Sequence, residues 1–403
     1  MKIVKKQYII WIMIISVFTG SCVEPFEIKT ITFEDALVIE ATITNELKHQ
    51  EINLTRTFQF EEDGPSNESN ARVRVVDDVQ NIYDFEESTP GKYLSILEFS
   101  AQPDINYVLE ITTTNGRSYS SQPTKLTGIT QIENVSASRE ISDDGDIGLS
   151  IFVDSFDPSG NSRYYRYEYE ETYKIIPLFW SRLDAIIISD VPPFEVGTTP
   201  RTKEERICFN TLFNNEIIQT QTNNLLEDRV SQFPIQFVSK DNPILRERYS
   251  ILVTQYVQSL EAFTYYKILN ELSGSESILS QNQPGFINGN VSSMDDPDEK
   301  VLGFFEIASV SSKRIFINFR DIFPGENRPF YFFKCNFKAP LLVNPERPNS
   351  SPLIDLIKTN SYKFFDINLE RTDALPGRYL MVENPCGDCT ELGTNIKPDF
   401  WVD

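Results

Sequence analysis

The residues with the clearest capacity for chemistry lie close to the C-terminus, where two cysteines are separated by two residues. This stretch reads CGDC, from Cys386 to Cys389. Such a pair can form half of a zinc site, act as a redox-active dithiol, or form disulfides that fix the chain. The choice depends on the compartment, because disulfides persist in oxidising surroundings.

The opening residues predict export and lipid attachment. Three lysines among the first six residues precede an apolar run over residues 8–18, which is too short to span a bilayer. Small residues then precede Cys22 in the sequence TGSC. This arrangement is typical of lipoprotein signals, in which the cysteine thiol is acylated. We therefore expect a signal peptide over residues 1–21, a lipid such as palmitate on Cys22, and a tether over residues 22–35.

Composition agrees with a globular protein held at a membrane by lipid. After the signal, every apolar run is broken by charge or proline well before eighteen residues, so no second crossing is expected. The 37 Lys and Arg residues stand against 59 Asp and Glu residues, which gives a net charge of -22. Such a surface repels the phosphate backbone of nucleic acids, so nucleic-acid binding is not expected.

Export determines how the remaining cysteines are interpreted. Four are left after Cys22, an even number in an oxidising compartment. A zinc site usually needs a second close pair, whereas Cys208 and Cys335 stand alone. The proline and glycine around Cys386 favour a turn over the helix start of a redox dithiol. We therefore expect structural disulfides, either Cys386 to Cys389 with Cys208 to Cys335 or a crossed version of these pairs.

The elements that position these cysteines are predicted to be mainly β-strands. Two β-branched runs flank a polar turn in residues 36–60, and an Asn-Gly pair further on is a strong hairpin signal. We expect an immunoglobulin-like or transthyretin-like sandwich over residues 36–127. A larger β-rich domain with one or two short helices should follow over residues 128–403 and end in the disulfide-stapled tail.

Two segments of the larger domain show clear periodicity. The segment SRYYRYEYEETY predicts a strand with Tyr165, Tyr167 and Tyr169 on one face and charged residues on the other. The segment SLEAFTYYKILNEL predicts a helix with Ser259 as its N-cap. Apolar residues at helical spacing on this helix indicate packing against a sheet.

Histidine-dependent catalysis is not expected, because His49 is the only histidine and lies in a polar turn. This excludes Ser or Cys triads that need histidine and zinc hydrolysis at a histidine site. The chain contains neither a GxxxxGK[ST] phosphate loop nor a GxSxG elbow. A hydrolase of surface polymers that needs only two carboxylates stays the least favoured alternative. We expect no enzyme activity, no cofactor and no metal.

Three further segments are candidates for binding. The acidic segments over residues 142–146 and 295–299 contain oxygen ligands of the kind that calcium takes, but neither has EF-hand spacing, which favours solvated turns. An apolar run around Phe179 and Trp180 is interrupted by prolines. A buried strand is the favoured interpretation of this run, and a partner interface is the alternative.

Several sequence segments, in their order along the chain, resemble those of one protein family. They include SQFPIQFV, RERYSILVTQYVQSLEAFTYYKILNEL, GFINGNVSSMDDPDEKVLGFFEIASVSSKRIFIN and CGDCTELGTNIKPDFW. Together with Cys208 they resemble the Bacteroidota lipoprotein family catalogued as domain of unknown function 4249. Many members carry a cysteine in the loop before DPDE, where this chain has Ser292 and Ser293. The resemblance therefore implies that the second disulfide uses Cys335 instead.

The resemblance also implies a function and a location. Members of the family are often encoded beside TonB-dependent outer-membrane receptors. This implies a lipid-anchored accessory or binding lipoprotein of the outer membrane. A location on the cell surface is favoured over one on the periplasmic face. The protein would help such a β-barrel take up an unidentified ligand, with Phe179 and Trp180 as candidate contact residues. The alternative is a structural subunit of an outer-membrane assembly or surface-export complex.

Overall fold

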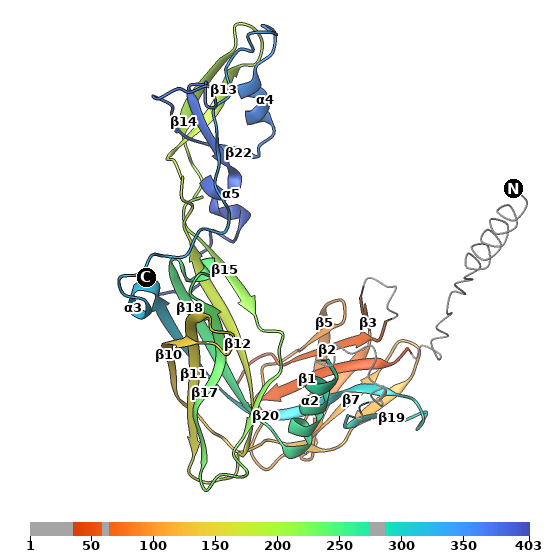
Figure 1. Cartoon of the computed structure of the whole chain (residues 1–403). Helices are drawn as coiled ribbons and strands as arrows, with labels where there is room; N and C mark the ends of the chain where they lie inside the picture. The colour runs from red at the N-terminus through yellow and green to blue at the C-terminus, as the bar shows by residue number, and fades with distance from the viewer. Residues whose placement is uncertain (1–34, 59–63, 274–286, 288) are drawn as a thin grey trace, which may run out of the picture.

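A computed structural model describes residues 35–58, 64–273, 287 and 289–403, and it is mainly β, as the sequence predicts. Strands form two lobes and a long arm (Figure 1). The described α-helices are α2 (Leu260–Ser273), α3 (Phe319–Ile322), α4 (Pro352–Lys358) and α5 (Asn384–Gly387). In the part of the chain that the structure describes, no helix is both long and apolar enough to cross a membrane.

The N-terminal lobe is sandwich-like and encloses one apolar core. Its strands are β1 (Leu37–Thr44), β2 (Glu51–Arg56), β3 (Ser66–Asn67), β4 (Arg72–Asp77), β5 (Ile82–Thr89), β6 (Lys92–Ser95), β7 (Asn106–Thr112), β8 (Ser118–Ser121) and β9 (Thr124–Lys125). Alternate side chains of β1, such as Ile39 and Ile43, are buried in this core. The intervening residues, such as Glu40, face away from the core, as the two-residue period of a strand requires.

Two later strands complete the N-terminal lobe. Strand β19 (Val291–Ser293) pairs antiparallel with β8. The first part of β20 (Val301–Asn318) pairs parallel with β1, and its second part pairs antiparallel with β18 (Arg248–Val257). Because β20 contributes to both lobes, their sheets join into one continuous path.

The central lobe packs two sheets against each other. One continues from β20 and β18 to β12 (Tyr164–Ile175), β15 (Cys208–Phe213) and β16 (Ile218–Gln221). The other contains β10 (Ile132–Ile141), β11 (Ile147–Asp157) and β17 (Asp228–Ser239). Tyr165 and Tyr167 are buried in the shared core, and Tyr169 packs against it. The tyrosine face predicted for this strand is thereby confirmed.

The arm extends from the central lobe, away from the N-terminal lobe (Figure 1). It contains the hairpin of β13 (Leu183–Ser189) and β14 (Glu195–Pro200) and the sheet of β21 (Phe337–Lys338), β22 (Tyr362–Ile367) and β23 (Tyr379–Glu383). A separate small core includes Leu353, Phe364 and Met381. The arm is therefore built from an insertion between β12 and β15 together with the last part of the chain.

Candidate functional site

The CGDC pair forms two long-range disulfides at the base of the arm. Cys389 is bonded to Cys208, which is 181 residues away, and Cys386 is bonded to Cys335, which is 51 residues away. The expectation that all four cysteines form disulfides is confirmed. Of the two expected arrangements, Cys386 to Cys389 with Cys208 to Cys335 is wrong, and a crossed version holds.

Local backbone geometry explains the crossed pairing. Cys386 lies in helix α5, whereas Cys389 begins the 3-10 helix η2 (Cys389–Glu391). Asp388 between them has an extended backbone, with φ of -148° and ψ of 117°. The two cysteines therefore belong to separate short helices and reach different neighbours.

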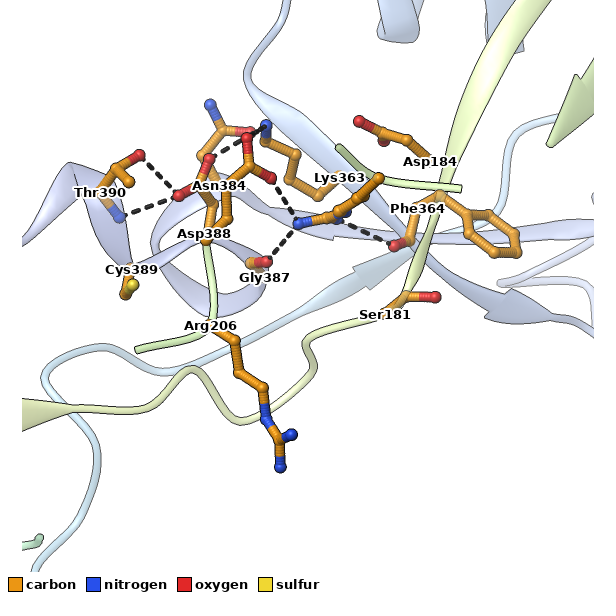
Figure 2. Close-up of polar contacts among 12 residues, drawn as sticks. Ser181, Asp184, Arg206, Lys363, Phe364, Asn384, Gly387, Asp388, Cys389 and Thr390 are labelled. Atoms are coloured by element: carbon orange, nitrogen blue, oxygen red, sulfur yellow. Dashed lines mark hydrogen bonds and ion pairs between the residues drawn. The ribbon is translucent and has the colours of Figure 1, made fainter. Parts of the chain in front are cut away.

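An ionic cluster lies beside these two disulfides (Figure 2). The carboxylate of Asp388 accepts hydrogen bonds from the backbone N–H and the hydroxyl of Thr390 at 2.9 and 2.6 Å, and lies 3.0 Å from Lys363 Nζ. Burial alone would raise the pKa of Asp388, but the contacts with Thr390 and Lys363 outweigh burial and lower it. Arg201 donates to the carbonyl of Gly387 at 2.9 Å. Because these charged groups are paired with other groups of the chain, we assign the cluster a structural role.

Other residues singled out from the sequence lie outside any shared site. Cys22 lies outside the described residues. Phe179 is half-buried and packs edge-on against Phe337, with ring centroids 4.7 Å apart. Trp180 is half-buried, with the Arg206 guanidinium 5.4 Å from its ring centroid. A partner contact at Phe179 and Trp180 stays a prediction.

The acidic segments make contacts within the chain. Asp295 accepts a hydrogen bond from the backbone of Ser118 at 2.7 Å, and Glu299 forms an ion pair with Arg117 at 2.7 Å. The 142–146 segment is a turn closed by a backbone hydrogen bond between its first and last residues. Within the described residues, no group of three or more His, Cys, Asp or Glu side chains is arranged to hold a metal ion.

A cleft of about 840 Å³ opens where the two lobes meet. Strands β1, β12, β18 and β20, helix α2 and the loop after β15 provide its walls. The acidic side chains that line it are Glu40, Glu168, Glu170 and Glu216, and the aromatic ones include Phe213, Tyr265 and Tyr266. Arg166 is the only basic residue among the lining residues. Sequence reasoning did not identify this cleft.

Arg166 lies at the back of the cleft in a buried ion cluster. Its guanidinium pairs with Glu168 and, at 3.5 Å, with Glu306. Burial would lower the pKa of Arg166, but Glu306 and Glu168, together with the neighbouring tyrosines, outweigh burial and raise it. Burial raises the pKa of Glu306, although Arg166 and a 3.0 Å hydrogen bond from Gln258 oppose this. The positive charge of Arg166 and the carboxylates of Glu168 and Glu306 therefore compensate one another in a buried position.

Two tyrosines join this cluster to the elements around it. The guanidinium carbon of Arg166 lies 4.3 Å from the ring centroid of Tyr256 on β18 and 4.8 Å from that of Tyr266 on α2. Such cation–π contacts strengthen when they are removed from water. The hydroxyl of Tyr256 donates to Glu168 at 3.0 Å. Helix α2 is thus fixed beside the sheet, where it forms one wall of the cleft.

Backbone packing fixes the same wall from the other side. Gly303 on β20 has a φ of +123°, which L side chains rarely adopt, and a Cβ there would lie 2.0 Å from the carbonyl oxygen of Ile39. Tyr265 on α2 packs against Phe304, with ring centroids 5.5 Å apart. The predicted N-cap is also present, since Ser259 accepts a hydrogen bond from the backbone of Ala262 at 3.1 Å.

One signal in the sequence could have pointed to the cleft. The strand with buried tyrosines carries Arg166, Glu168 and Glu170 on its other face, and these three side chains line the cleft. Glu306 gives a weaker signal, because it is the one acid of β20 and stands in an apolar stretch between Phe305 and Ile307.

Comparison with curated proteins gives no match. The model of a family described as Domain of unknown function (DUF4249) matches residues 23–314, well over half of the chain. The matched range ends at residue 314, four residues before the end of β20, and includes every residue that lines the cleft. On this evidence the chain belongs to the DUF4249 family.

Proposed function

We propose that this chain is a lipid-anchored binding protein of the outer membrane that assists a TonB-dependent transporter or a similar β-barrel and has no catalytic activity. The observation that carries the binding role is the cleft at the junction of the lobes. Its volume of about 840 Å³ is in the range of ligand sites, and structural elements wall it on several sides. Its side chains suit recognition by charge and by aromatic contact.

The lining of the cleft favours a ligand with positive charge beside an apolar part. The carboxylates of Glu40 and Glu216 have no ion-pair partner among the described residues, whereas Arg166 is already paired with two carboxylates. Tyr265 and the exposed ring of Phe213 add aromatic surface. Amines and guanidinium groups, such as lysine and arginine side chains, combine attraction to carboxylates with attraction to aromatic faces.

The role beside a β-barrel rests on the sequence. The predicted lipid on Cys22 would confine the protein to the plane of the membrane, which raises its effective concentration near a barrel. The resemblance to lipoproteins encoded beside TonB-dependent receptors favours such a barrel as the partner. A stable contact of this kind buries more than about 1,000 Å². The long arm and the two lobes offer enough surface for it.

Affinity purification tests the barrel partner. The protein is crosslinked at native expression, extracted in mild detergent, and compared with Cys22→Ala. We expect a β-barrel to copurify with the wild type and to be strongly reduced with the variant. Recovery of the lipoprotein alone, with no barrel enriched above the Cys22→Ala control, contradicts the transporter role.

Peptide binding tests the cleft. Calorimetric titration with trilysine should show binding that the double variant Glu40→Lys/Glu216→Lys abolishes, because the substitutions reverse two charges at the cleft. Glu370→Lys is the matched control, since Glu370 is exposed and lies outside the cleft. If the double variant and the control bind trilysine equally, the cleft is not a site for cations.

A further inference from the structure

A second, smaller pocket lies at the other end of the strands that form the cleft. Its volume is about 300 Å³. It is lined by the C-terminal end of β12, the first residue of β18, the end of β20, helix α3 and the end of the tail. The basic residues of its lining are Lys174, Arg246, Arg248, Arg320 and Arg328, and the acidic ones are Glu247 and Asp403.

The charge of this pocket is opposite to that of the chain. The chain has a net charge of -22, and yet five basic side chains and two acidic ones meet here. Like charges at close range repel one another, so a cluster of this kind is costly unless an anion compensates it. Protein side chains compensate it only in part. Glu247 pairs with Arg328 at 3.0 Å and lies 4.0 Å from Arg246, and Asp403 pairs with Lys174 at 3.0 Å. Two carboxylates thus serve three of the five basic side chains.

Several donors in the pocket are unused. Arg248 donates from Nη1 to Asn318 at 3.0 Å, but its Nε is buried and has no hydrogen-bond partner. The Nε of Arg246 is also buried without a hydrogen-bond partner. The side chain of Arg320 is exposed and forms no hydrogen bond or ion pair with the residues that the structure describes. The guanidinium of Arg320 therefore keeps all its donors, and Arg246 and Arg248 each keep one donor without a hydrogen-bond acceptor at the same small pocket.

We infer that this pocket is an anion site that takes a phosphate group. Arginine matches the oxygens of phosphate with several charge-assisted hydrogen bonds at once. A carboxylate carries one negative charge, whereas a phosphate monoester carries between about 1.5 and 2 near neutral pH. The dianion therefore compensates more of the excess positive charge. A pocket of about 300 Å³ is at the small end of ligand sites, which suits a single phosphate group.

Two sources of this group can be separated by titration calorimetry on the purified mature protein. One arm uses inorganic phosphate, and the other uses detergent micelles that contain phosphatidic acid, with phosphatidylcholine micelles as the blank. Binding heat in the titration with inorganic phosphate shows that a free phosphate ion is sufficient to occupy the pocket. Heat in the micelle arm alone identifies a lipid headgroup as the source. Either result supports the site, and added salt should weaken the binding because the attraction is between charges.

Arg320→Gln is the decisive variant, because Arg320 makes no contact that the fold needs. Loss of one charge-assisted hydrogen bond should weaken binding about tenfold. Arg371→Gln is the matched control, since Arg371 is exposed and lies outside the pocket. Circular dichroism of both variants should match the wild type. The inference is overturned if neither arm shows binding, or if Arg320→Gln and Arg371→Gln bind equally well.

Discussion

The guanidinium of Arg166 lies 3.5 Å from the carboxylate of Glu306, although the two residues are 140 positions apart. Arg166 belongs to β12 of the central lobe, and Glu306 belongs to the part of β20 that pairs with β1. The ion pair therefore links the two lobes at the back of the cleft. Tyr266 on α2 adds the helix to the same link.

Replacement of Arg166 by Met should lower the free energy of unfolding by about 3 to 5 kcal/mol, because it leaves the buried carboxylate of Glu306 without a compensating charge. Urea unfolding followed by circular dichroism measures this loss. Arg139→Met is the control, since Arg139 pairs with Glu326 at the surface and should cost about 1 kcal/mol or less. Equal losses for the two variants contradict the importance of the buried cluster.

The disulfide connectivity can be read from peptides. Digestion of unreduced, denatured protein with a protease that cuts before aspartate separates Cys386 from Cys389, because Asp388 lies between them. We expect Cys389 to be linked to the peptide of Cys208, and Cys386 to that of Cys335. If the peptides of Cys386 and Cys389 are instead joined directly to each other by a disulfide, this connectivity is wrong.

Removal of each disulfide should also lower stability. Chain entropy predicts about 5 kcal/mol for the loop closed by Cys208 and Cys389, and about 4 kcal/mol for the loop closed by Cys335 and Cys386. Double replacement of either pair by serine should therefore lower the midpoint of thermal unfolding. The measurement is a thermal melt of each variant without reductant, with reduced wild type as the reference.

Acid should destabilise the fold partly through Asp157. Burial of this carboxylate opposes its charge, but hydrogen bonds from Ser159, Asn161 and Ser162 outweigh burial and lower its pKa to about 2, from a usual value of 3.8. A lowered pKa in the folded state means that the stabilisation is complete above pH 3.8 and is lost as the pH falls toward about 2.

Asp157→Asn should lack this dependence and cost about 2 kcal/mol at neutral pH, where hydrogen bonds to a charged group are lost. Urea unfolding of the wild type and the variant at a series of pH values tests both statements. The difference in their unfolding free energy should shrink in this acidic range. A difference that stays constant down to low pH contradicts the assignment.

Lipid attachment at Cys22 is tested by metabolic labelling with a fatty-acid probe. We expect the wild type to be labelled and to sediment with membranes, because the TGSC junction is typical of lipoprotein processing. Cys22→Ala should lose the label and either appear in the soluble fraction or accumulate unprocessed. Unchanged attachment of the unlabelled variant to membranes disproves the prediction.

Trp180 and Phe179 should respond differently to substitution. Trp180→Glu is expected to weaken copurification with the barrel while the fold is retained, because the side chain is only half-buried. Phe179→Ala should instead lower the free energy of unfolding by about 3 kcal/mol, since the ring packs against Phe337 and Phe365. Copurification that is unaffected by Trp180→Glu removes this residue from the predicted contact.

Local patterns in the sequence were sufficient for the class of fold and for several of its elements. Period-two alternation predicted the strand of Tyr165 and Tyr167, because successive side chains of a strand point to opposite faces. The N-cap at Ser259 was predictable for a similar reason, since a cap depends on residues within one turn. Four cysteines in a chain that is expected to be exported predicted disulfides from their number and the expected compartment alone.

The tertiary structure decided which distant residues meet. Which cysteines pair depends on how α5 and η2 separate Cys386 from Cys389, and spacing alone does not contain this information. The parallel pairing of β20 with β1 and the ion pair of Arg166 with Glu306 likewise connect residues more than a hundred positions apart. Alternation shows which face of a strand is buried, but it does not show which strand lies beside it. The cleft and the basic pocket both form between such strands, and for that reason only the folded chain reveals them.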